Sequence, residues 1–130
     1  MISVREAREQ FRPADVKVLF IAEAPPCATD RFFYFTEVNT GDSLFLYLIR
    51  AVFPDLDNIP TKQLRSMKEE LLFRFQEEGF YLEDSLSLPL LKGTTPIQKL
   101  KTIRAGQFEL HQTILPYRST SKVVLLSSTV

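Results

Sequence analysis

The sequence contains a single cysteine, Cys27, among its 130 residues. One cysteine cannot form a disulfide within the chain, a cysteine-based zinc cluster or a cysteine-ligated iron–sulfur cluster. We therefore expect a reduced, cytosolic protein that has neither a metal site nor a cofactor.

The sequence also has no excess of charge and no long hydrophobic run. Sixteen basic and sixteen acidic residues give a formal net charge of zero. A nucleic-acid partner would therefore have to be held by a local patch and not by the overall charge. No apolar stretch reaches the roughly 18 residues that cross a membrane. The first residues mix Arg and Glu, unlike a secretory signal. We expect a soluble cytoplasmic chain without a membrane partner.

The composition is that of a globular protein. Hydrophobic residues make up 45% of the chain and charged residues 25%. A chain of this length builds one hydrophobic core, so residues 1–130 are predicted to form a single domain.

Hydrophobic spacing and capping patterns predict seven elements. Capping boxes begin the first and last helices, at Ser3 with Glu6 and at Thr95 with Gln98. Gly79 is expected to end the longest helix. The predicted helices cover about residues 4–12, 44–53, 61–78 and 97–114, and the predicted strands cover about 16–22, 80–86 and 122–126.

Strands that alternate with helical crossovers favour an α/β domain with three α/β/α layers and a parallel sheet. In such sheets ligands bind beyond the carboxyl ends of the strands, here residues 22–35 and 83–92. The chain stops four residues after the third strand pattern, so we expect that a C-terminal strand and helix are missing. The third predicted strand would then lie at the sheet edge and expose an apolar rim. We expect this rim either to self-associate or to be shielded by another segment.

The junction after the first strand is the most informative part of the sequence. Val16 to Ala22 form an apolar, β-branched run, and the chain then continues through Glu23, Ala24, Pro25 and Pro26. Proline cannot donate to the ladder, so a buried strand leads directly into a stiff loop that carries one acid. This segment resembles the first motif of the uracil-DNA glycosylase superfamily, in which family-4-like members carry a strand followed by Gly-Glu-Ala-Pro-Gly.

The resemblance implies a parallel sheet in the order 2-1-3-4, of which this chain would lack the fourth strand. It also implies hydrolysis of the N-glycosidic bond of a flipped base. Glu23 would act on water, and Ala24 and Pro25 would line the substrate site with it. Phe33 or Tyr34 would stack on the base, and Asp84 falls near the family's base-reading Asn.

The sequence departs from the family pattern at several positions. Ala22 and Pro26 replace two glycines, Asp84 replaces Asn, and the four iron–sulfur cysteines are absent. The family's His-containing loop would lie beyond Val130. Two hypotheses therefore remain: a glycosylase-like domain that binds DNA or a nucleobase, or a non-catalytic small-ligand or protein-interaction module with the same fold.

Overall fold

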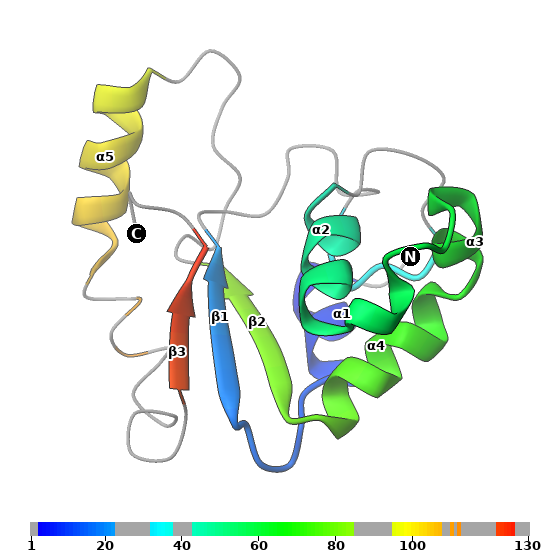
Figure 1. Ribbon diagram of the computed structural model, residues 1–130. Helices are drawn as coiled ribbons and strands as arrows, with labels where there is room; N and C mark the ends of the chain where they lie inside the picture. The colour runs from blue at the N-terminus through cyan, green and yellow to red at the C-terminus, as the bar shows by residue number, and fades with distance from the viewer. Residues whose placement is uncertain are drawn as a thin grey trace.

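The computed structural model describes residues 3–22, 32–37, 43–84, 95–107, 110, 112 and 122–126 (Figure 1). Three strands form one parallel sheet in the order β2-β1-β3. Their bounds are Val18–Ala22 for β1, Phe80–Asp84 for β2 and Lys122–Leu125 for β3. The predictions of an α/β chain, a parallel sheet and this strand order are confirmed.

β1 is the central strand, and its sequence explains why. Four of its five residues are buried, as expected for an apolar strand that is covered on both faces. It starts at Val18, two residues later than predicted, and the amides of Lys17 and Val18 both donate to the Gly79 carbonyl.

The helices begin and end close to the predicted positions. Ser3 caps the first helix by accepting from the Glu6 amide at 3.1 Å, and both halves of the Thr95–Gln98 capping box are present. The later part of the predicted 97–114 helix lies largely outside the described residues. The helices are α1 Val4–Gln10, α2 Ser43–Val52, the 3-10 helix η2 Pro54–Leu56, α3 Thr61–Ser66, α4 Lys68–Glu77 and α5 Pro96–Ala105.

The prediction of one continuous helix over residues 61–78 is wrong. The backbone leaves helical geometry at Met67, with φ −103° and ψ 10°, and this residue ends α3 and precedes α4. Lys68 follows the break and is 1% exposed, with Nζ donating to the Phe32 carbonyl at 3.3 Å. Thr61 begins α3, and its hydroxyl accepts from Arg50 Nη2 at 3.2 Å. The residue after the break thus contacts a distant part of the chain, which helical spacing in the sequence does not reveal.

Gly79 connects α4 to β2 in a conformation that other residues avoid. Its φ is +79°, and a Cβ atom there would lie 2.8 Å from Lys17 Cγ. The prediction that Gly79 ends the helix is confirmed, since Gly79 follows directly after the last turn of α4.

Residues of α4 and of the chain that follows α1 contact the two faces of β2. Phe80 packs against Phe75 of α4, whereas the alternate residue Tyr81 lies under the Arg12 guanidinium, which follows α1. Successive residues of a strand point to opposite faces, so these two contacts lie on opposite sides of the sheet. Figure 1 shows α2 and α4 on the β2 side of the sheet and α5 on the β3 side. Within the described ranges, no helix combines the length and apolar character needed to cross a bilayer.

The two outer strands have different outer edges. Along β2, the Leu82 amide donates to the Tyr34 hydroxyl at 2.7 Å, so a buried side chain closes that edge. Along β3, Val123 and Leu125 are 42% and 53% exposed. Among the described residues, no strand pairs with the outer side of β3.

Candidate functional site

The carboxyl ends of β1 and β2 lie side by side. Ala22, the last residue of β1, is in register with Asp84, the last residue of β2. Asp84 therefore lies at the sheet edge where parallel α/β proteins bind ligands. The Asp84 side chain is 4% exposed, and the Glu83 side chain beside it is 8% exposed.

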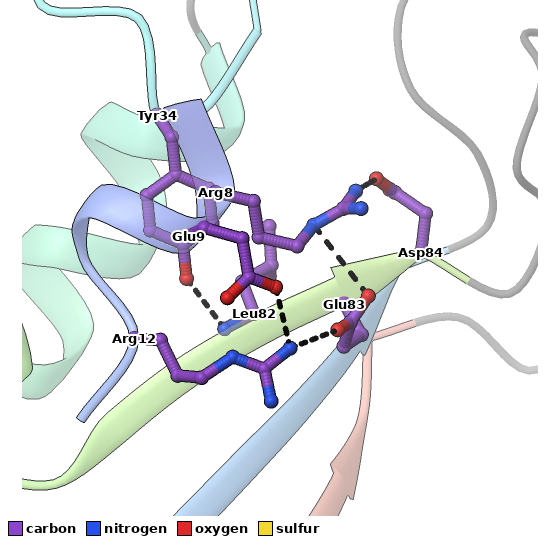
Figure 2. A network of polar contacts seen from close by, with 7 residues as sticks. All are labelled: Arg8, Glu9, Arg12, Tyr34, Leu82, Glu83 and Asp84. Carbon is purple, nitrogen blue, oxygen red and sulfur yellow. Dashed lines mark hydrogen bonds and ion pairs between the residues drawn. The ribbon is translucent and has the colours of Figure 1, made fainter. Parts of the chain in front are cut away.

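Arg8 of α1 pairs with both of these carboxylates. Its Nη2 donates to Asp84 Oδ2 at 2.7 Å, and its Nε lies 3.5 Å from Glu83 Oε2 (Figure 2). Burial of a charged group is costly unless it is paired. Arg8, itself 16% exposed, therefore compensates two buried carboxylates that follow each other in one strand.

Arg12 extends this cluster toward the surface. Its Nη2 lies 2.7 Å from Glu9 Oε1 and 4.0 Å from Glu83 Oε1, and its guanidinium carbon lies 5.1 Å from the centre of the Tyr81 ring. Figure 2 shows the resulting series of contacts from Asp84 through Arg8, Glu83 and Arg12 to Glu9. We call these five residues the acid–arginine cluster. Three carboxylates against two guanidiniums leave it with a formal charge of −1.

Burial changes the acidity of the cluster. It raises the pKa of Asp84 to about 6, although the ion pair and hydrogen bond with Arg8 act in the opposite direction. Burial also raises the pKa of Glu83, opposed by Arg8 and Arg12. The pKa of Tyr81 is raised too, first by burial and then by the Glu83 charge. Asp84 can therefore gain or lose a proton close to neutral pH, which a carboxyl in water does not do.

The predicted aromatic residues lie inside the protein. Phe33 is 3% exposed and its ring packs against Phe45 and Phe75. Tyr34 is 1% exposed, stacks on Phe11 and binds the Leu82 amide. Burial raises the pKa of the Tyr34 hydroxyl well above its ordinary value. In this arrangement both rings contact other parts of the core.

Of the remaining predicted site residues, only Asp84 belongs to the part of the chain that the structure describes. Asp84 lies at a strand end, as predicted. Glu23, Ala24 and Pro25 lie outside the described residues, so their role stays a prediction. In the sequence Glu23 directly follows Ala22, the last residue of β1. His111 and Cys27 also lie outside the described residues.

In the described ranges, no group of three or more His, Cys, Asp or Glu side chains is arranged to bind a metal ion.

Arg8 and Arg12 were not predicted from the sequence to be part of a site. The two residues are four apart, one turn of a helix, and so they reach the same side of α1 and the chain that follows it. The available signal was Glu83-Asp84 at the end of an apolar strand, because two adjacent buried acids require cationic partners. That signal does not say which of the sixteen basic residues supplies them.

Comparisons with protein-family models, with curated proteins and with solved structures find no match for this chain.

Proposed function

We propose that this chain is a divergent uracil-DNA glycosylase-like domain that binds a nucleobase, either free or within DNA, beyond the carboxyl ends of the strands, where residues 22–35 and 83–92 follow β1 and β2. The observation that supports this proposal is the strand order β2-β1-β3 in a parallel sheet. The strand that follows β1 in the sequence, β2, lies on one side of β1 in the sheet, and the next strand, β3, lies on its other side. In open α/β sheets of this order the ligand binds at such a switch point. Glu23, the acid of the motif, is the first residue beyond it on β1.

Asp84 supplies a second acidic group one strand away. Its register with Ala22 puts it next to the start of the Glu23 segment, and Arg8 holds its carboxylate at 2.7 Å. A carboxylate accepts hydrogen bonds, so it suits the amino groups of cytosine, adenine or guanine better than the carbonyl groups of uracil. The replacement of Asn by Asp thus favours an amino-bearing base.

Hydrolysis at this site would follow the chemistry of the family. Glu23 would orient a water molecule and accept one of its protons, the water oxygen would bond to C1′ of the sugar, and the bond between C1′ and the base nitrogen would break. The departing base would take up a proton. Asp84, whose pKa is raised to about 6, is the candidate donor in its protonated form, in which one oxygen gives up the proton while the other can still accept from a base amino group.

A second candidate is a non-catalytic module that binds a small ligand or a protein. It is favoured by the burial of Phe33 and Tyr34, which leaves no described ring of the aromatic segment 32–34 exposed for a base to stack on. The pairing of Asp84 with Arg8 also resembles a structural ion pair.

Binding of fluorescent single- and double-stranded oligonucleotides at two salt concentrations distinguishes the two candidates. The proposal predicts binding that weakens as salt increases and that Glu23→Gln reduces at least about tenfold. Glu37→Gln, at an exposed position, is the matched control and is expected to bind normally. Absence of binding to oligonucleotides and to free nucleobases at low salt would exclude the proposal.

A glycosylase assay then separates an enzyme from a binding domain. Duplexes that carry single modified or mismatched bases are incubated with the protein, and abasic sites are detected by alkaline strand cleavage. An active enzyme is expected to lose its activity in Glu23→Gln while keeping its fold. DNA binding without abasic sites in any duplex would assign the chain as a non-catalytic nucleobase-binding domain.

A further inference from the structure

The outer edge of β3 presents backbone groups that nothing in the described part of the sheet engages. The amide of Lys122 donates to the Lys17 carbonyl and the amide of Leu126 donates to the Ile21 carbonyl. Amides alternate in direction along a strand, so the even-numbered residues face β1 and the amides and carbonyls of Val123 and Leu125 face outward. These two residues also carry the exposed apolar side chains of the strand.

We propose that this edge binds the β3 edge of a second copy of the chain, antiparallel, and so joins two sheets into one of six strands. The inference uses none of the residues of the proposed site, since it concerns the side of β3 that faces away from β1.

The spacing of the outward groups selects one register. If Val123 of one copy pairs with Leu125 of the other, both outward amides and both outward carbonyls of each copy are satisfied, with four hydrogen bonds across the two-fold axis. Val123 and Leu125 are then cross-strand neighbours on one face of the sheet, where apolar pairs stabilise antiparallel strands. The edge is thus complementary to itself.

Charge does not oppose this pairing. The chain has a net charge of zero, so two copies do not repel each other as a whole. In the proposed register each Lys122 lies opposite Leu126 of the second copy. The two lysines are then at opposite ends of the paired segment, roughly 13 Å apart along the strand, which exceeds the screening length at physiological salt.

The opposite edge of the sheet supports the same conclusion. The outward amide of Leu82 in β2 is satisfied by the Tyr34 hydroxyl, and α1 residues contact the end of that strand. Proteins commonly cover an edge strand to prevent pairing with other chains. In the described part of the chain such a cover is found on β2 and not on β3.

A strand of four residues buries little surface, so the dimer is expected to be weak. Sedimentation equilibrium of the full chain from about 10 μM to about 1 mM is expected to show a monomer–dimer equilibrium. Leu125→Pro removes only an outward amide and should weaken dimerisation at least about tenfold. Ile97→Lys, which removes another exposed apolar side chain, is the matched control and should not change the equilibrium.

Cysteine cross-linking tests the register and does not depend on the proline variant. In a Cys27→Ser background, Val124→Cys places two thiols opposite each other on the two-fold axis, about 4.5 Å apart at Cα, and should form a disulfide-linked dimer under mild oxidation. Leu125→Cys places its thiols diagonally, beyond about 7 Å at Cα, and should cross-link far less.

Three results would overturn the proposal. The first is a monomer at every concentration. The second is a dimer that Leu125→Pro leaves unchanged. The third is slow hydrogen exchange of the Val123 and Leu125 amides that is independent of protein concentration, because this would show that another segment of the same chain covers the edge.

Discussion

Arg8 Nη2 and Asp84 Oδ2 form a 2.7 Å ion pair between residues 76 positions apart in the sequence. The pair connects α1, at the start of the chain, to the last residue of β2, at the sheet edge where the proposed site lies. Its two side chains are 16% and 4% exposed, so it is shielded from water far better than a surface ion pair.

The first prediction concerns Arg8. Arg8→Ala leaves Glu83 and Asp84 buried without their shared partner, and we expect the free energy of unfolding to fall by about 3 kcal/mol. Urea unfolding followed by circular dichroism measures this change. Arg5→Ala, on the exposed side of the same helix, is the control and should change stability by less than about 0.5 kcal/mol. Equal effects of the two substitutions would show that the ion pair does not stabilise the fold.

The second prediction concerns pH. Because the pKa of Asp84 is raised from 3.8 to about 6 in the folded chain, the folded state binds more protons than the unfolded state between these values. The contribution of Asp84 to stability is therefore fully present below about pH 4 and is lost as the pH rises through about 6.

This contribution is measured as the difference in unfolding free energy between the wild-type chain and Asp84→Asn at each pH. Between pH 4 and pH 7 we expect the wild-type chain to lose about 3 kcal/mol of unfolding free energy relative to Asp84→Asn. Carbon-13 NMR of the Asp84 carboxyl should give a midpoint near 6. A midpoint below about 4, with no pH dependence of the difference, would contradict the prediction.

The third prediction concerns the edge of β2. Tyr34→Phe keeps the ring in the core but removes the hydroxyl that accepts the Leu82 amide, which leaves a buried donor unpaired. We expect a loss of about 1–3 kcal/mol in stability and faster hydrogen exchange at the Leu82 amide. Tyr47→Phe removes the same group from a ring that is 75% exposed and should alter neither quantity. Unchanged exchange at Leu82 in Tyr34→Phe would rule out this role of the hydroxyl.

The fourth prediction concerns the connection between α4 and β2. Gly79→Ala forces a side chain into a left-handed conformation and into Lys17 Cγ, so we expect destabilisation of about 1–2 kcal/mol. Thermal unfolding should show a lower midpoint. Gly106→Ala is the control, because Gly106 has an ordinary φ of −88° and should tolerate the methyl group. A similar midpoint for both variants would indicate that the connection rearranges freely.

The candidate site was predictable only in part. The position of Asp84 at the end of an apolar strand followed from the sequence pattern, since the apolar run from Phe80 to Leu82 marks the strand that precedes it. The burial of Phe33 and Tyr34 did not follow, because the same rings suit a core and a binding surface equally well. The role of Arg8 was also hidden, because a charged residue in an amphipathic helix is most often exposed to solvent.

Some features of this fold depend on residues close together in the chain and could be predicted from them. They are the cap at Ser3, the capping box at Thr95, the turn at Gly79 and the apolar central strand ending at Ala22. The break at Met67, the burial of Tyr34 and the pairing of Arg8 with Asp84 became visible only in the folded chain. These features depend on which distant segments pack together, and the energy of burying a charge or a hydroxyl is set by the partner it meets there.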